Sequence, residues 1–393
     1  MDNLIVENIK HRPLRTAISI IGVALGVILI VLMVGLAHGM TDDSNQRQSN
    51  VDAEIRFMPE EFGSSAQANP LIMPARYAEV IMKGVQPTTE DPDIQPRPPI
   101  AGVISSTPIG ELLQSTEGGI GYGLVDGIDY ASFAKTTTIN LLAGRPLGDG
   151  KTPGAEYEAI VDRFYSEHNT DVNGEAIGVG SKISALGHEF TVVGIYEPSM
   201  LARIKIPLYT MQQLTGGAEN CTFVLVRTEK PELAKQVKAD LEKTYPGHRA
   251  ILTSELPALF SQNLRLIQAF LNVVIWLAII ISTLVILLAM YTTIIERTRE
   301  IGILKSLGAS KPFIVYTIEK EAALISALGV ALGFTIALVG KYFIEKNTTL
   351  IIEIEFVWLV IAAIIGLACG IVGALYPAIR AANLDPIDAL SFE

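Results

Sequence analysis

The fold is decided by residues 270–290, which read FLNVVIWLAIIISTLVILLAM. This run carries no charged side chain, and as a helix rising 1.5 Å per residue it would span a hydrocarbon core of roughly 30 Å. A continuous apolar run favours a helix over a barrel strand, whose side chains would alternate. Similar runs at 17–37, 322–339 and 356–378 complete a prediction of four transmembrane helices.

The charged residues are concentrated outside these runs. The chain of 393 residues is 49% hydrophobic and 18% charged, with a formal net charge of −11 and a mean hydropathy of +0.39. Residues 41–262 hold 29 acidic and 18 basic side chains, so this segment carries the whole negative excess. An acidic domain of this kind disfavours nucleic acid as a partner.

Basic residues near the ends of the runs predict the orientation, because short loops rich in Lys and Arg stay in the cytoplasm. Both termini are therefore predicted to be cytoplasmic, with 41–262 outside, in a multi-pass protein of the cytoplasmic (inner) membrane. A cleaved signal peptide is the alternative for the first run, but its 21 residues exceed the roughly 7 to 15 of a signal sequence core. The basic residues concerned are Lys10, Arg12, Arg15, Arg297, Arg299, Lys305, Lys311 and Arg380.

The segment between the first two runs is long enough to fold as an extracytoplasmic domain, periplasmic or extracellular. Strand and helix patterns at both of its ends predict one split α/β subdomain, so the fold class is a four-helix membrane protein with a large α+β domain inserted between helices 1 and 2. The helical pattern at 256–272 is unbroken and predicts a stalk. The predicted divisions are 1–40, 41–262 with a strand-rich insert at about 121–198, and 263–393 for the stalk and the last three transmembrane helices.

Catalytic signatures are weak. Residues 148–152, GDGKT, resemble the end of a phosphate loop, but Arg145 stands where that loop needs glycine. The five histidines show no metal-ligand spacing, and no Gly-x-Ser-x-Gly elbow occurs. The apolar runs lack charges at their centres, which disfavours an ion-coupled transporter. We therefore predict that the chain is not an enzyme, binds no metal or cofactor of its own, and takes its energy from another protein.

Residues 293–310, TIIERTREIGILKSLGAS, follow the second run and predict a short amphipathic helix over 293–307. Ile294, Ile301 and Leu304 fall on one face of that helix, and Gly308 ends it. A helix fixed to the end of a span could act as a lever that a cytoplasmic partner moves. An interfacial anchor is the alternative, and the residues alone favour neither.

Glycines at GxxxG spacing predict close contacts between transmembrane helices, within or between protomers. Glycine is common in such helices, so the spacing alone does not establish a contact. Pro377 predicts the end of the fourth helix. The pairs are Gly22/Gly26, Gly35/Gly39, Gly329/Gly333 and Gly366/Gly370.

Four separated motifs carry a family resemblance that covers nearly the whole chain. They are ENIKHRPLRTAISIIGVALG at 7–26; ERTREIGILKSLGA at 296–309 with EAALIS at 321–326; PAIRAANLDPIDAL at 377–390; and LAGRPL, GVGSKI and FTVVGI at 142–147, 178–183 and 190–195. With these motifs the chain resembles the MacB/FtsX-like permeases, the type VII transmembrane subunits of ABC transporters.

The resemblance implies a homodimer, or a pair of related permeases, above two copies of a separate ABC ATPase that holds the ATP and Mg. Residues 293–307 resemble the coupling helix that docks on this ATPase, and motion would reach the external domain by mechanotransmission. MacB itself carries an ATPase at its amino terminus, for which this chain has no room before Ala17. The residues implied to couple to the ATPase are Glu296, Arg297, Glu300, Ile301, Gly302, Leu304, Lys305 and Gly308.

Three functions remain open within the resemblance. Export or extraction of a substrate is favoured, with a membrane-fusion adaptor as a candidate partner, because the external motifs resemble those of the MacB type. A lipoprotein-releasing permease shares the topology. An FtsX-like relay that activates an extracellular hydrolase is the alternative of a different class.

Overall fold

The computed structural model describes residues 13–60, 71–85, 97–115, 122–256, 258–259, 265–347 and 350–385. The chain forms two compact units. The membrane unit comprises Met1–Met40, Leu266–Glu345 and Leu350–Glu393, and the external unit comprises Thr41–Arg265 and Lys346–Thr349.

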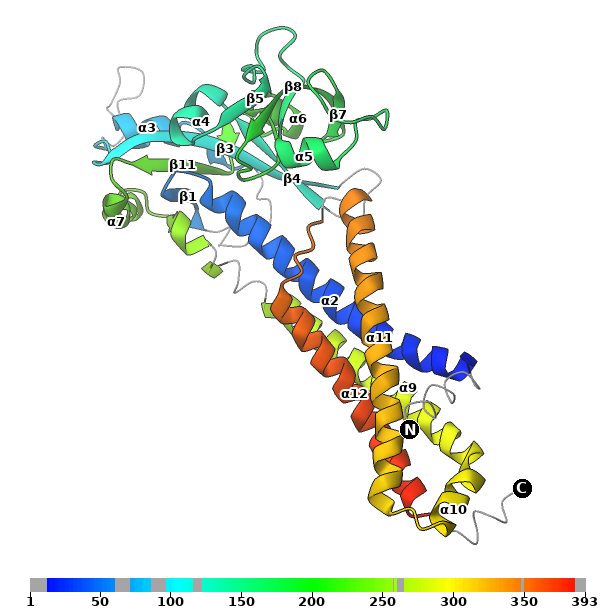
Figure 1. Ribbon diagram of the computed structural model, residues 1–393. Helices are drawn as coiled ribbons and strands as arrows, with labels where there is room; N and C mark the ends of the chain where they lie inside the picture. The colour runs from blue at the N-terminus through cyan, green and yellow to red at the C-terminus, as the bar shows by residue number, and fades with distance from the viewer. Residues whose placement is uncertain are drawn as a thin grey trace. The chain divides into compact units, whose positions relative to one another are not determined.

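Four long helices build the membrane unit, which confirms the four predicted apolar helices (Figure 1). Their shared core is aliphatic and draws residues from all four helices. Large apolar side chains such as Trp276 and Ile364 remain exposed on the outside of the unit, as suits helices whose solvent is lipid. The helices are α2 (Pro13–Ser49), α9 (Arg265–Glu296), α11 (Lys311–Asn347) and α12 (Phe356–Ala382).

Two predicted packing glycines of α2 lie against α9. A Cβ added to Gly22 would come within 2.6 Å of Val285 Cγ1, and one added to Gly26 would overlap the hydroxyl of Ser282. That hydroxyl donates a 3.1 Å hydrogen bond to the carbonyl oxygen of Gly22. The glycines therefore let a polar contact form between two helix backbones in an apolar environment.

Two more of the predicted glycine pairs lie against neighbouring helices of the same chain. A Cβ added to Gly329 or Gly333 of α11 would lie 3.0 Å from a backbone carbonyl oxygen of α2. On α12, a Cβ on Gly366 would meet an α11 side chain at 2.7 Å, and one on Gly370 would overlap the hydroxyl of Ser326. Side chains larger than hydrogen would push these helices apart.

The pair Gly35/Gly39 has a different neighbour from the one its spacing predicts. Both glycines of α2 lie against an extended segment, residues 351–354, which precedes α12. The amide of Glu353 donates a 2.9 Å hydrogen bond to the carbonyl oxygen of Gly35. The small residues here accommodate extended backbone rather than another helix.

The prediction that Pro377 ends the fourth helix is wrong. Pro377 lies inside α12, which continues to Ala382. The residues beyond the proline are packed, since Ala381 and Ala382 are buried in a cluster with Ile294 and Ile314. Tertiary packing therefore maintains the helix across a residue that weakens it locally.

A mixed sheet organises the external unit (Figure 1). The described residues form ten strands in one sheet, in the order β12-β1-β11-β3-β4-β9-β6-β8-β5, with β7 paired to β8. Two pairs are parallel, β4 with β9 and β6 with β8, and the others are antiparallel. The strands are β1 (Ile55–Pro59), β3 (Val103–Ser115), β4 (Tyr122–Ile128), β5 (Asn140–Gly144), β6 (Glu158–Asp162), β7 (Lys182–Ala185), β8 (His188–Glu197), β9 (Ile204–Pro207), β11 (Phe223–Thr228) and β12 (His248–Leu252).

The sheet has two parts that meet at the long strand β3. Strands β12, β1, β11 and β3 come from both ends of the segment, and two helices cover one face of them, α3 (Tyr77–Lys83) and α7 (Ala234–Thr244). The insert contains the strands from β4 to β9 and therefore continues past residue 198, where the sequence placed its end. Also present are α4 (Tyr130–Thr136), α5 (Arg163–His168), α6 (Leu208–Thr215) and a two-stranded ribbon of β2 (Met73–Pro74) and β10 (Asn220–Cys221).

The predicted stalk lies partly outside the described residues. Of its residues 256–272, 257 and 260–264 fall outside them. Both cysteines are free and buried, Cys221 in the external unit and Cys369 in α12. Burial raises the pKa of the Cys221 thiol to about 12, so this thiol is unreactive at neutral pH.

A buried carboxyl group in the external unit predicts a pH dependence of stability. Burial raises the pKa of Glu111 from an ordinary 4.5 to about 7, with Arg56 opposing the shift and Asp126 adding to it. The folded state therefore binds more protons than the unfolded chain between these two values. The contribution of Glu111 to stability is fully present below pH 4.5 and is lost as the pH rises towards 7.

The Glu111→Gln variant should remove this pH dependence. Between pH 5 and pH 7.5 the wild-type external unit should lose up to about 3 kcal/mol through this group. The difference in unfolding free energy between the two pH values is measured by urea unfolding of the full chain in detergent, with amide hydrogen exchange in β3 as the readout. If the free energy of unfolding changes equally with pH in wild type and in Glu111→Gln across this range, Glu111 does not titrate there.

Candidate functional site

The predicted helix over 293–307 is interrupted. Residues 293–296 belong to the end of α9, and a separate helix α10 (Thr298–Ser306) follows after Arg297, whose φ of −105° and ψ of 9° are not helical. The hydroxyl of Thr298 donates to the carbonyl oxygens of Ile294 and Ile295 at 3.1 and 2.8 Å. The break therefore gives α10 its own direction after the second span, as Figure 1 shows.

The end of α10 is a Schellman motif, and its glycine is required. Gly308 has a φ of +96°, a left-handed conformation that favours glycine. Its amide donates to the carbonyl oxygen of Lys305, and the amide of Ala309 donates to that of Leu304, both at 3.0 Å. These two bonds satisfy carbonyl groups that the end of a helix leaves open.

The inner face of α10 packs on its own membrane unit. Ile301 is buried in a cluster with Ile294, Ile314 and Ala381, which come from α9, α11 and α12. Gly302 is also buried. Ile301 and Gly302 therefore help to position α10 on its own membrane unit, and a contact of either residue with an ATPase stays a prediction.

Two charged side chains attach α10 to the neighbouring helices. The guanidinium of Arg297 lies 3.3 Å from the carboxylate of Glu321 on α11 and 3.4 Å from that of Glu300. The ammonium of Lys305 donates to the carbonyl oxygens of Ala382, at 3.0 Å, and of Leu384, beyond the end of α12. A cation at this position is favoured because the last carbonyl groups of a helix carry partial negative charge.

The outer face of α10 combines apolar and acidic residues. Leu304 is 46% exposed and Leu307 is 81% exposed, with Ile303 beside them. The carboxylate of Glu300 is 70% exposed. We call Glu300, Ile303, Leu304 and Leu307 the outer face. Exposed apolar side chains at this density, rimmed by charge, are typical of a protein-binding surface.

The predicted coupling residues thus separate into two groups. Glu296, Glu300, Leu304 and Gly308 are exposed, whereas Arg297, Ile301, Gly302 and Lys305 contact the rest of the membrane unit. Sequence reasoning missed Ile303 and Leu307 on the outer face and Glu321 on α11. The apolar character of Ile303 and Leu307 was visible, but which apolar side chains of α10 are buried depends on its contacts with α9, α11 and α12.

The segment that resembles a phosphate loop is held by carboxylates of its own unit. Asp149 accepts the backbone amides of Lys151 and Thr152 at 2.9 Å, and Glu158 accepts that of Gly148 at 3.1 Å. Arg145 pairs with the same buried Glu158 carboxylate. A phosphate would need these amides as donors, so the loop does not have the structure of a phosphate site.

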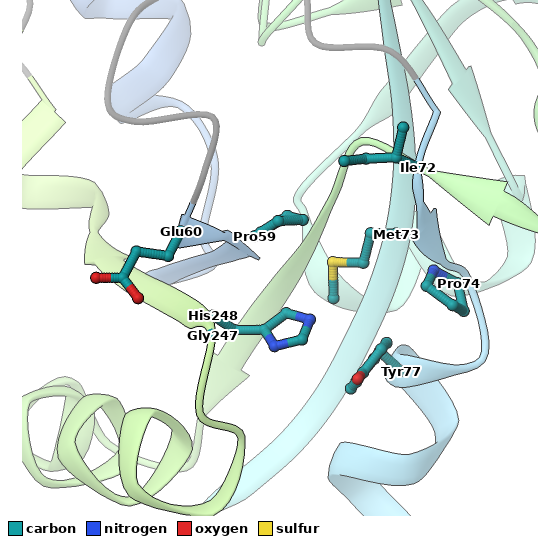
Figure 2. Close-up of a pocket in the computed structure, with 8 residues that line it drawn as sticks. All are labelled: Pro59, Glu60, Ile72, Met73, Pro74, Tyr77, Gly247 and His248. Carbon is teal, nitrogen blue, oxygen red and sulfur yellow. The ribbon is translucent and has the colours of Figure 1, made fainter.

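Figure 2 shows a hollow in the external unit with a volume of about 450 Å³. The rings of Tyr77 and His248, which line it, lie 4.8 Å apart, and the ring of Phe57 stacks on that of His248 at 5.0 Å. Burial lowers the pKa of His248, so this ring is neutral at pH 7. Among the described residues, no group of three His, Cys, Asp or Glu side chains could hold a metal ion.

Two segments of the chain match known protein families. Residues 16–244 match the family described as MacB-like periplasmic core domain. Residues 272–386 match the family described as FtsX-like permease C-terminal. The second match contains α10, α11 and α12 and most of α9.

Three curated relatives differ in how much of their length the chain spans. A probable export ATP-binding/permease protein of Pseudomonas fluorescens is 24% identical over 98% of this chain and 59% of its own length. The macrolide export ATP-binding/permease protein MacB of Shigella sonnei is 27% identical over 58% of this chain and 36% of its own length. An uncharacterized ABC transporter permease of Bacillus subtilis, YvrN, is 23% identical over 98% of both chains.

Proposed function

The chain belongs to the MacB/FtsX-like family of ABC transporter permeases, and we propose that it converts ATP hydrolysis by a separate cytoplasmic ATPase into movement of its external unit. Two of the relatives named above are described as export proteins, and the third as an uncharacterized ABC transporter permease. The proposed activity is therefore export or extraction of a substrate, with the reaction itself performed by the partner ATPase.

The observation that carries the proposal is the construction of α10. Its outer face exposes Leu304 and Leu307 beside Glu300, which suits a groove on a partner protein. Its inner face is fixed to α11 by Arg297 and to α12 by Lys305. A force applied to the outer face would therefore reach three helices of the membrane unit, whereas an interfacial anchor would not need these ties.

The proposed assembly contains two copies of the ATPase beneath a homodimer or a pair of related permeases. The exposed apolar residues of α9, Phe270 and Trp276 among them, offer surface for lipid or for a second protomer. We propose that both termini and α10 face the cytoplasm and that the external unit lies outside. The acidic net charge of the external segment and the basic residues around α10 support this orientation.

Reconstitution tests the division of labour between the two proteins. The purified chain in lipid nanodiscs should hydrolyse no ATP above background, because its glycine-rich loop is held by its own carboxylates. Adding the ABC ATPase that co-purifies with it should give an ATP turnover that depends on both proteins. Hydrolysis by the isolated chain, after removal of any trace of the ATPase, would contradict the proposal.

A further inference from the structure

The last turns of α2 hold a short segment of the external unit. We call residues 199–203, which connect β8 to β9, the clasp. The side-chain amide of Asn50 donates to the carbonyl oxygen of Ser199 at 2.7 Å. The amide of Leu201 donates to the carbonyl oxygen of Arg47 at 3.2 Å, and the guanidinium of Arg47 donates back to that of Leu201.

The other side of the clasp is fixed to the core of the sheet. The ammonium of Lys205 donates to the carbonyl oxygens of Met200 and Ala202 at 3.0 and 2.9 Å and to the carboxylate of Asp126 at 2.9 Å. The amide of Ala202 donates to the same carboxylate. Lys205 and Asp126 are fully buried, so the clasp cannot move without moving β4 and β9.

Arg203 joins α2 to the insert through both arms of its guanidinium. One nitrogen lies 2.5 Å from the carboxylate of Asp43 on α2, and the other lies 2.8 Å from that of Asp162 on β6. Asp162 is fully buried and caps the start of α5 by accepting a hydrogen bond from the amide of Tyr165. The Arg203 side chain covers the ring of Phe164 at 4.0 Å. Lysine could not make both contacts in this fixed geometry.

We propose that Arg203 is a positioning residue that passes movement of α2 into the insert of the external unit, an inference that rests on the function proposed above. Helix α2 is continuous from its apolar residues to Ser49, so displacement along its axis reaches Asp43 and Arg47. The fork of Arg203 carries that displacement to Asp162, and hence to β6 and α5. The clasp carries it to β4 and β9.

Amide hydrogen exchange of the full chain with its ATPase in nanodiscs tests this role. We compare samples with and without Mg and a non-hydrolysable ATP analogue. In the wild type, the analogue should change exchange in the last turns of α2 and in β6, β8 and β9. In Arg203→Ala, the change in α2 should remain, while the change in β6 should fall about fivefold or more, the size of a typical coupling between sites.

Two further variants separate coupling from folding. Asp43→Ala removes the contact of Arg203 on α2, together with the pair that Asp43 makes with Arg47 on the same helix, and leaves the Arg203–Asp162 pair intact. It should therefore reduce the analogue-dependent change at least as much as Arg203→Ala does, without raising exchange in the absence of nucleotide. Arg163→Ala is the matched control, because Arg163 lies on the same insert, pairs with Glu167 and Glu197, and is exposed. It should behave as wild type.

The possible results distinguish the two proposals. If the analogue leaves α2 unchanged in the wild type while the ATPase is bound, the proposed function fails. If α2 responds and both Asp43→Ala and Arg203→Ala pass the full change to β6, the role of Arg203 is wrong. If Arg203→Ala raises exchange in the insert without nucleotide and Asp43→Ala does not, the Asp43→Ala variant settles the question. A full analogue-dependent change in β6 of Asp43→Ala would overturn the role of Arg203, and a reduced change would support it.

Discussion

Replacing Leu304 by glutamate should abolish assembly with the partner ATPase. Leu304 is 46% exposed at the centre of the outer face, between Ile303 and Leu307. Apolar anchors at the centre of interfaces contribute about 2 kcal/mol or more, and a buried unpaired carboxylate adds a further penalty. A total of about 3 kcal/mol or more corresponds to an affinity at least about 100-fold lower. Co-purification of the ATPase and the ATP turnover that depends on this chain measure the loss.

The control for this substitution is Leu142→Glu. Leu142 is the same residue type with nearly the same exposure, 47%, but it lies on β5 of the external unit. That variant should assemble and support turnover as wild type does. Wild-type assembly of Leu304→Glu would reduce α10 to an interfacial anchor and remove the basis of the proposed function.

Glu300→Lys is a second test of the same face, with a smaller expected effect. The substitution reverses a mostly exposed charge and also removes the contact with Arg297, so part of its effect would be internal to the chain. Gly302→Leu, which the sequence suggests as another docking test, is unsuitable because Gly302 is buried within the membrane unit. A larger side chain there would displace α10 itself.

Features that depend on local sequence were predictable. The four apolar helices follow from the length of uncharged runs, and the end of α10 follows from Gly308, whose left-handed backbone any reader of the sequence can anticipate. The break at Arg297 was not predictable, because neither Arg297 nor its neighbours Glu296 and Thr298 disfavour a helix strongly. It coincides with a contact to Glu321 on α11, 24 positions away in the chain.

Side-chain contacts with residues distant in the chain could also not be predicted from the sequence. The family resemblance implies that Lys305 contacts the ATPase, and the structure shows that its ammonium donates to carbonyl groups at the end of α12. Lys205 lies in the strand sequence Ile204-Lys-Ile-Pro207, whose alternation predicts an exposed lysine. The strand is buried on both faces, and the lysine is balanced by Asp126 on a neighbouring strand.

Replacing Lys205 by methionine should destabilise the external unit by about 3–5 kcal/mol, because it leaves the Asp126 carboxylate buried without its cation. Methionine retains most of the side-chain volume beside the rings of Phe133 and Tyr196, which lie 5.1 and 5.3 Å from the ammonium. Urea unfolding of the full chain in detergent should be followed by amide hydrogen exchange in β4 and β9. Tryptophan fluorescence would not report unfolding of the external unit, since Trp276 and Trp358 both belong to the membrane unit.

Lys182→Met is the matched control, because Lys182 makes an ion pair of similar length with Glu189 on the same insert, at 3.0 Å, but both side chains are exposed. Its loss should cost about 1 kcal/mol or less. Adding Asp126→Asn to Lys205→Met should restore much of the lost stability, since the amide oxygen can still accept from Ala202 without a buried charge. If Lys205→Met and Lys182→Met unfold at the same urea concentration, the buried pair contributes no more than an exposed one. The clasp would then lack the rigid inner attachment through which Arg203 is proposed to act.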